Sequence, residues 1–163
     1  MSKIQLMTPE EMERRLCNGE DEIDLSIEKW CLIIRAWNNE QLVEFHEISC
    51  RTCALCFNHD RYTEEQGYCK SCPWPKHFGI CCDEPPDGLW KQASTALNDY
   101  LFNDAEHEEV TAKFVAVRNA LMELREEKEL EKSNRGDSTT MAPEGDDCKP
   151  TDKDTAIGER VQG

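Results

Sequence analysis

The sequence predicts a small, mainly α-helical protein in which helices flank an irregular cysteine-rich module, followed by a disordered C-terminal tail. Three observations predict this fold class. Apolar residues recur every three or four positions on both sides of the module, which is the period of a helix with one buried face. Seven of the ten cysteines lie within residues 50–82. Large apolar residues nearly vanish in residues 133–163, so this segment cannot bury enough surface to offset the entropy of ordering it.

Two helices are predicted before the module. Thr8 and Glu11 form a T-x-x-E capping box, and Pro9 occupies the first helical position, where its missing N–H is not needed. Gly19 can adopt the left-handed conformation that ends many helices. A second helix is predicted over residues 22–37, because six side chains there share one face. They are Ile23, Ile27, Trp30, Cys31, Ile34 and Trp37.

Two more helices are predicted after the module. Asp87, within a Pro-Pro-Asp-Gly turn, is expected to cap a helix over residues 89–102, and Asp104 to start the last helix. The apolar residues of that last helix are spaced four, three, four and three: Val110, Phe114, Val117, Leu121 and Leu124. This spacing predicts a seam that packs on another helix of the same chain, with a helix-mediated dimer as the alternative.

The cysteines at the centre of the module have the spacing of metal ligands. Cys53 and Cys56 form one C-x2-C pair, and Cys69 and Cys72 form a second one twelve residues later. Each pair brings two sulfurs together from one tight turn, so four thiolates can surround one Zn²⁺ tetrahedrally. A complete set of four thiolates leaves no position for water, so this zinc is expected to hold structure rather than to catalyse hydrolysis.

Other ligand sets remain open. Cys50, Cys81 and Cys82 are alternate zinc ligands. An iron–sulfur cluster is the alternative cofactor, and its ligands would be Cys50, Cys53, Cys56 and Cys72. His59 and His77 are less favoured ligands, since a loop histidine is more often a solvated side chain. A redox role for the second C-x2-C pair is disfavoured because no βαβ pattern surrounds it.

Cysteines and aromatic residues outside these sets have simpler interpretations. Cys17 and Cys31 fall on apolar helical faces and are interpreted as core thiols. Trp74 lies between two prolines that restrict its backbone. It is interpreted as part of a small core that covers the metal site, with an anchor at a protein interface as the alternative.

The charge of the chain favours a protein partner over nucleic acid. Asp and Glu number 34 against 19 Lys and Arg, which gives a net charge of -15. Binding to nucleic acid depends on clustered basic residues that neutralise phosphates, and the basic residues of the module are scattered among acids. We therefore expect a partner with a basic surface. A nucleic-acid-associated zinc protein and an acidic mimic of DNA are the alternatives.

Targeting signals and catalytic motifs are not visible in the sequence. The first residues lack the apolar run of a secretory signal, and no stretch approaches the roughly 20 apolar residues of a membrane helix. We expect a cytoplasmic protein whose thiols bind metal in a reducing environment. H-E-x-x-H, Gly-rich phosphate loops and G-x-S-x-G are absent from the sequence, so a non-enzymatic function is expected.

The order of these motifs resembles small cysteine-rich proteins encoded by bacteriophages. The resemblance covers residues 26–90. It rests on Lys29-Trp30, Cys53-Ala-Leu-Cys56, Cys69-Lys-Ser-Cys72-Pro73, Gly79 before Cys81 or Cys82, and Trp90. It implies a phage product in the cytoplasm of the bacterial host, with a zinc site and no established activity. Cys50 and the doubled Cys81-Cys82 depart from the pattern, so the fourth ligand stays open.

Together these features divide the chain into four segments. Residues 1–48 contain the N-terminal helices, and residues 49–88 form the cysteine-rich, metal-binding module with its pair of zinc knuckles. Residues 89–132 contain C-terminal helices that pack on the N-terminal ones, and residues 133–163 form the acidic tail. The expected function is a zinc-stabilised protein-interaction module, such as a phage regulator or inhibitor of a host protein. An iron–sulfur redox protein is a further, less favoured alternative.

Overall fold

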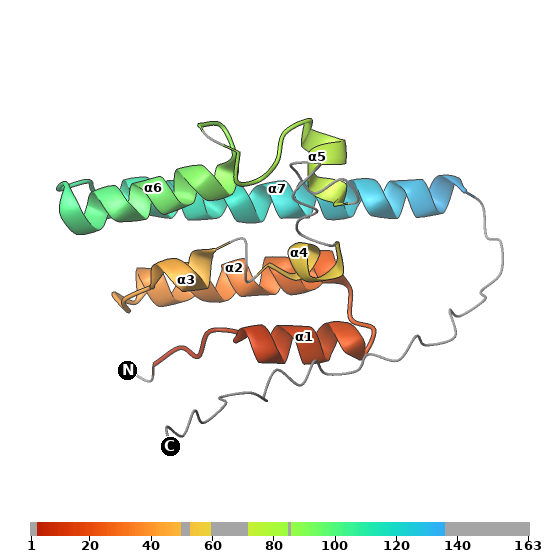
Figure 1. Ribbon diagram of the computed structural model, residues 1–163, viewed down its shortest axis with the longest axis horizontal. Helices are drawn as coiled ribbons and strands as arrows, with labels where there is room; N and C mark the ends of the chain where they lie inside the picture. The colour runs from red at the N-terminus through yellow and green to blue at the C-terminus, as the bar shows by residue number, and fades with distance from the viewer. Residues whose placement is uncertain (1–2, 50–52, 60–71, 85, 136–163) are drawn as a thin grey trace, which may run out of the picture.

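The computed structural model describes residues 3–49, 53–59, 72–84 and 86–135, and all regular secondary structure in these ranges is helical (Figure 1). The helices are α1 Pro9–Cys17, α2 Glu22–Asn38, α3 Phe45–Ile48, α4 Ala54–Asn58, α5 Pro73–Phe78, α6 Leu89–Phe102 and α7 His107–Asn134. The prediction of a small, mainly helical protein is confirmed. The predicted tail falls outside the described residues except for its first three positions.

Three long helices form the body of the molecule. The 28-residue helix α7 runs alongside both α2 and α6, so the helices before and after the module pack together as predicted (Figure 1). Helix α1 lies parallel to α2 in Figure 1, and the short helix α4 contacts both of them. Helix α5 packs on α7. The short helix α4 is therefore attached to α1 and α2, and α5, which follows Cys72, is attached to α7.

The core is built around aromatic side chains from three helices. The Trp30 ring meets the Trp90 ring edge to face, with centroids 5.4 Å apart, and meets the Phe114 ring at 5.6 Å. The five seam residues of α7 are all buried within the single chain. Their seam is therefore used for packing inside the molecule. The indole N–H groups of Trp30 and Trp90 are buried without an acceptor among the described residues, so packing has to offset their desolvation.

Local signals placed several helix ends correctly. The Glu11 N–H donates to Thr8 Oγ1 at 3.1 Å, and Gly19, just beyond α1, has a φ of 86°. Helix α2 ends one residue later than predicted, and α6 has the predicted bounds. These ends are fixed by capping and by periodicity, which act over a few residues.

One predicted cap and one predicted helix start were wrong. Gly88, and not Asp87, is the N-cap of α6, because Gly88 fits against the backbone of residues 81–84. Asp104 does not start α7. It has a φ of 58°, a left-handed conformation that Asp tolerates better than most residues, and the chain turns there before Glu106 caps the helix. Helix α7 also continues to Asn134, because Glu, Leu and Lys at its end favour helix.

Asp21 was not predicted as a cap, yet it links two helices. Its Oδ1 accepts from the N–H of Ile23 at 2.8 Å, and its Oδ2 accepts from Lys128 Nζ on α7 at 2.7 Å. Burial raises the pKa of the Asp21 carboxyl, but the hydrogen bonds from Lys128 and the backbone outweigh burial and hold this pKa below its ordinary value of 3.8.

We expect Asp21→Ala to lower the free energy of unfolding by about 1–2 kcal/mol near pH 7, because it removes a cap and an ion pair. The folded-state pKa is lowered, so this stabilisation is present above pH 3.8 and is lost as the pH falls through the folded-state value. Urea unfolding at pH 7 and at pH 3 measures both effects. Asp24→Ala, in the same turn, is the control, because its pair with Arg125 is long and exposed. An equal loss for Asp21→Ala at both pH values would contradict this account.

Candidate metal centre

The first C-x2-C pair forms one turn at the start of α4. Cys53 is the N-cap of this helix, and its carbonyl accepts from the N–H of Cys56 at 3.0 Å. Residues three apart on a helical turn lie on the same side, so both sulfurs face the same space. Cys53 is 1% exposed and Cys56 is 5% exposed. The two residues of this pair therefore share one turn, as their spacing predicts.

The other described cysteines of the module flank α5. Cys72 is its N-cap and is buried, and Pro73 occupies the first helical turn. After α5 the chain turns at Gly79, which has a φ of 73°, and reaches Cys81 and Cys82. The N–H of Trp90 donates to the carbonyl of Cys82 at 2.9 Å. This bond ties the Cys82 backbone to the first turn of α6.

Cys82 joins the first pair. Its thiol lies next to those of Cys56 and Cys81, and the Cys53 thiol lies next to that of Cys56. The contact with Cys56, the contact with Cys81 and burial, in that order, raise the pKa of the Cys82 thiol. The contact with Cys56 and burial raise the pKa of Cys53. Such thiols are protonated at neutral pH, and a bound cation would favour the thiolates instead.

A buried lysine and a buried serine lie beside this thiol cluster of Cys53, Cys56, Cys81 and Cys82. Ser26 Oγ is 3.6 Å from Cys53 Sγ and is 1% exposed. Lys29, one turn further along α2, is 3% exposed and donates from Nζ to the carbonyl of Ser49 at 3.3 Å. The Lys29 charge acts to lower the pKa of Cys53. A buried ammonium is rare unless a negative charge compensates it, and thiolates in this cluster would supply that charge.

The predicted ligand set is therefore only partly described. Cys53, Cys56 and Cys72 are buried in one core, and the alternate ligand Cys82 belongs to the same core. Cys69 and the alternate Cys50 lie outside the described residues. Within the described part of the chain, His, Cys, Asp and Glu side chains do not form a group of three or more that could hold a metal ion. The four buried cysteines and Lys29 still fit a thiolate-bound cation in their chemistry.

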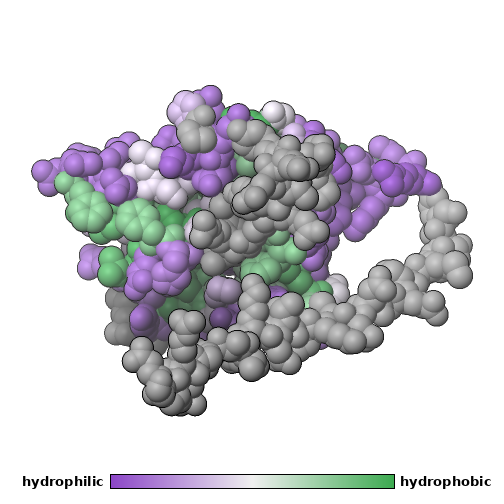
Figure 2. All heavy atoms as spheres, in the orientation of Figure 1, coloured by the Kyte–Doolittle hydropathy of each residue, from purple (hydrophilic) through white to green (hydrophobic). Residues whose placement is uncertain are grey.

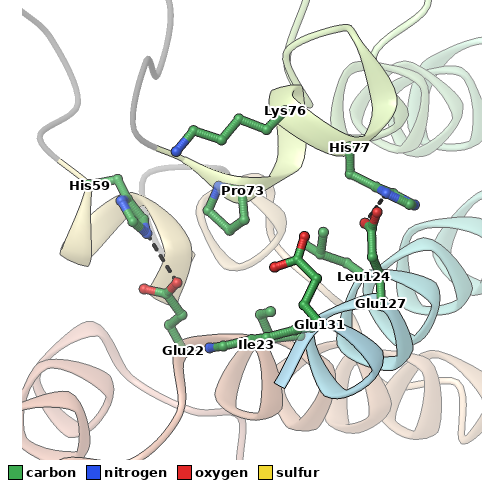
Figure 3. Close-up of a pocket in the computed structure, with 10 residues that line it drawn as sticks. Glu22, Ile23, His59, Pro73, Lys76, His77, Leu124, Glu127 and Glu131 are labelled. Atoms are coloured by element: carbon green, nitrogen blue, oxygen red, sulfur yellow. Dashed lines mark hydrogen bonds and ion pairs between the residues drawn. The ribbon is translucent and has the colours of Figure 1, made fainter. Parts of the chain in front are cut away.

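His59 and His77 are engaged with carboxylates instead. His59 Nε2 lies 3.0 Å from Glu22 Oε1, and His77 Nε2 lies 3.1 Å from Glu123 Oε1 while its Nδ1 contacts Glu127. Both histidines border a cleft of about 360 Å³, across which Lys76 extends toward His59 (Figure 3). The pairs join α4 to α2 and α5 to α7. They attach the two short helices next to the cysteines, α4 and α5, to the long helices α2 and α7.

The structure also places Trp74, Cys31 and Cys17, which the sequence assigned to the core. Trp74 is buried in the main core, and its ring lies 4.7 Å from that of Phe78 and 5.0 Å from that of Trp90, so it packs inside the molecule as expected, while its role as a cover of the metal site stays a prediction. Cys31 is partly buried. Cys17 is exposed and disulfide-bonded, so its interpretation as a core thiol was wrong; it is the last residue of the short helix α1.

Ser26 and Lys29 were missed by sequence reasoning. A signal existed, because Ser26, Lys29 and Ile33 follow the helical period three and four residues apart. Polar residues that interrupt an apolar face in this way indicate a buried polar contact. Nothing in the pattern indicated that the contact would be with Cys53, which is 27 residues away.

Comparison of the chain with protein families, with curated proteins and with solved structures found no match in any of the three. Among the helices of the described residues, none has the length and apolar character needed to cross a membrane.

Gly88 holds the Cys81-Cys82 turn in place by lacking a side chain. A Cβ at this position would lie 2.5 Å from the Cys82 carbonyl oxygen and 2.8 Å from that of Cys81. Its φ of -60° is open to any residue, so the restriction is steric. We expect Gly88→Ala to lower the free energy of unfolding by about 1–3 kcal/mol and to weaken metal binding, since the turn must move.

Urea unfolding and competition with a chelator measure these two effects. Gly19→Ala is the matched control, because Gly19 has a φ of 86° but nothing within 4 Å of its added Cβ. It is expected to reduce stability by about 1–2 kcal/mol and to leave metal affinity unchanged. Equal metal affinity in Gly88→Ala and the unaltered chain would show that the turn is not part of the centre.

Proposed function

We propose that this chain is a non-enzymatic protein-interaction module whose cysteine-rich segment folds around one zinc ion. Cys53, Cys56 and Cys82 are the proposed ligands, with Cys72 as the fourth. Cys69 and Cys50, which lie outside the described residues, are the candidates that would replace Cys72 or Cys82 as ligands. The observation that carries the proposal is the burial of the four proposed ligand cysteines in one core, with Lys29 buried near Cys53.

The role of the zinc follows from the donor set. Four thiolates fill a tetrahedral Zn²⁺ and leave no position for a reacting water. The ion would bring together α4, the start of α5 and the turn before α6, which are short elements with little core of their own. Its binding free energy would then contribute to folding, as it does in small zinc domains. This supports a structural and non-catalytic centre.

The surface charges support a protein partner. Several basic side chains are already paired with carboxylates: Arg15 with Glu20 and Glu28, Lys128 with Asp21, and Arg125 with Asp24. Such pairs cannot neutralise phosphates without being broken, which disfavours nucleic acid. The net charge of -15 instead favours a partner with a basic surface. From the surface charge and the motif resemblance together, we infer that the chain is a phage-encoded regulator or inhibitor of a host protein in the bacterial cytoplasm.

Elemental analysis of the purified chain tests the centre. The expected result is one zinc per chain, without iron or acid-labile sulfide, after purification under reducing conditions. Iron and sulfide with a brown colour would replace the zinc proposal by an iron–sulfur centre. A chain that stays metal-free after refolding with zinc would overturn it altogether.

A further inference from the structure

An exposed apolar surface lies at the end of the molecule opposite the carboxyl end of α7. Two grooves of about 510 and 420 Å³ meet there, and Leu42 lines both. Leu42 is 65% exposed, although its neighbour Val43 is fully buried. Figure 2 shows hydrophobic atoms at this end, where α2 and α6 finish, bordered by hydrophilic ones. We name this the end surface, and its apolar members are Leu42, Phe45, Tyr100 and Leu101.

The end surface is held rigid from below. Trp37 forms its floor and is 4% exposed. Its ring stacks on His107 at a centroid distance of 4.6 Å, meets Tyr100 edge to face at 4.9 Å, and its Nε1–H donates to Thr111 Oγ1 at 3.1 Å. A floor fixed by these contacts loses little conformational freedom when a ligand binds, which favours affinity.

The loop that presents Leu42 is also fixed. Gln41 exchanges two hydrogen bonds with the backbone of Ile4, at 2.9 Å and 3.0 Å, and its N–H donates to the Ala36 carbonyl at 3.0 Å. Glu40 has a φ of 56°, a strained conformation for a residue other than glycine. The hydrogen bonds of Gln41 therefore fix a strained turn that keeps the Leu42 side chain exposed to solvent. Contiguous exposed apolar surface on a fixed frame is typical of protein interaction sites.

The acidic side chains at the end surface indicate which kind of partner segment would bind there. Glu40 lines one groove and Glu44 the other, and His46 pairs with Glu44 at 3.1 Å. The described residues that line the two grooves include no Lys or Arg. Apolar side chains with a carboxylate rim fit a segment that carries apolar side chains flanked by Lys or Arg.

We propose that the end surface docks a basic amphipathic helix of the partner protein, with Leu42 and Tyr100 as its main apolar contacts. This inference rests on the proposed function as an interaction module and names the surface that performs it. The acidic rim would orient the helix, and the apolar groove would hold it.

A synthetic helical peptide with leucines on one face and lysines on the other is the probe. Fluorescence anisotropy of the labelled peptide measures its binding to the full zinc-loaded chain. We expect binding that Leu42→Arg weakens about tenfold or more, because the change removes an apolar contact and adds repulsion. Leu130→Arg is the matched control, since Leu130 is 64% exposed on α7 and lines neither groove. It is expected to keep affinity within about twofold.

Two further peptides and a measurement of zinc content distinguish failure of this inference from failure of the proposed function. Peptides with serine for leucine or glutamate for lysine are expected to bind weakly. Equal binding by the glutamate peptide, or no difference between Leu42→Arg and Leu130→Arg, would overturn the inference. Self-association that sedimentation detects and Leu42→Arg abolishes would make a second copy the occupant instead. A zinc-loaded, folded chain that does not bind the leucine–lysine peptide overturns this inference alone, whereas a chain without zinc overturns the proposed function.

Discussion

Cys56→Ala is expected to release the zinc and to lower the free energy of unfolding by several kcal/mol. Cys56 contacts both Cys53 and Cys82, so its removal separates the two parts of the thiol cluster. Structural zinc in small domains contributes binding free energy on the order of 10 kcal/mol, much of which is folding free energy. Zinc content by elemental analysis and stability by urea unfolding are the measurements.

Cys31→Ala is the matched control for this change. It also removes one thiol, and Cys31 is partly buried on α2 outside the thiol cluster. We expect it to retain zinc and to reduce stability by about 1–2 kcal/mol. Full zinc occupancy in Cys56→Ala, or loss of zinc in Cys31→Ala, would mean that the thiol cluster is not the metal centre.

Trp90→Ala is expected to lower the free energy of unfolding by about 3–5 kcal/mol, the usual range for truncating a large buried aromatic side chain. The Trp90 side chain is 1% exposed and lies between the rings of Trp30 and Trp74. The change would leave a cavity where the long helices meet the cysteine-bearing segments. Urea unfolding measures the loss, and near-ultraviolet circular dichroism reports the packing of the remaining tryptophans.

Phe102→Ala provides the comparison for Trp90→Ala. Both residues are aromatic and lie on α6, but Phe102 is 72% exposed. An exposed truncation of this kind is expected to change stability by no more than about 0.5 kcal/mol. Similar losses in the two variants would place the core elsewhere than at the tryptophan cluster.

The fold was predictable where its causes are local. The Thr8 cap fixes the start of α1, and the four-three spacing of α7 identifies its buried face. The start of α7 was not predictable. Asp is a residue type that often caps helices, but Asp104 adopts a left-handed conformation instead. Its conformation depends on how α6 and α7 meet, which the local sequence does not specify.

In the candidate site, too, local features were predictable from the sequence and tertiary contacts were not. The C-x2-C spacing predicts that Cys53 and Cys56 share a turn, and they do. Spacing does not determine which turns meet, and Cys82 joins this pair through the packing of Gly88 and Trp90. The burial of Lys29 likewise depends on tertiary contact, since a lysine on a helix is usually solvated.

X-ray absorption at the zinc edge of the purified chain is the most direct measurement of the central proposal. We expect four sulfur neighbours at about 2.3 Å, the usual zinc–thiolate distance. Replacement of one sulfur by a lighter atom in Cys82→Ser would then identify Cys82 as a ligand. Nitrogen or oxygen neighbours throughout, at about 2.0–2.1 Å, would contradict a thiolate-held zinc ion as the centre of this fold.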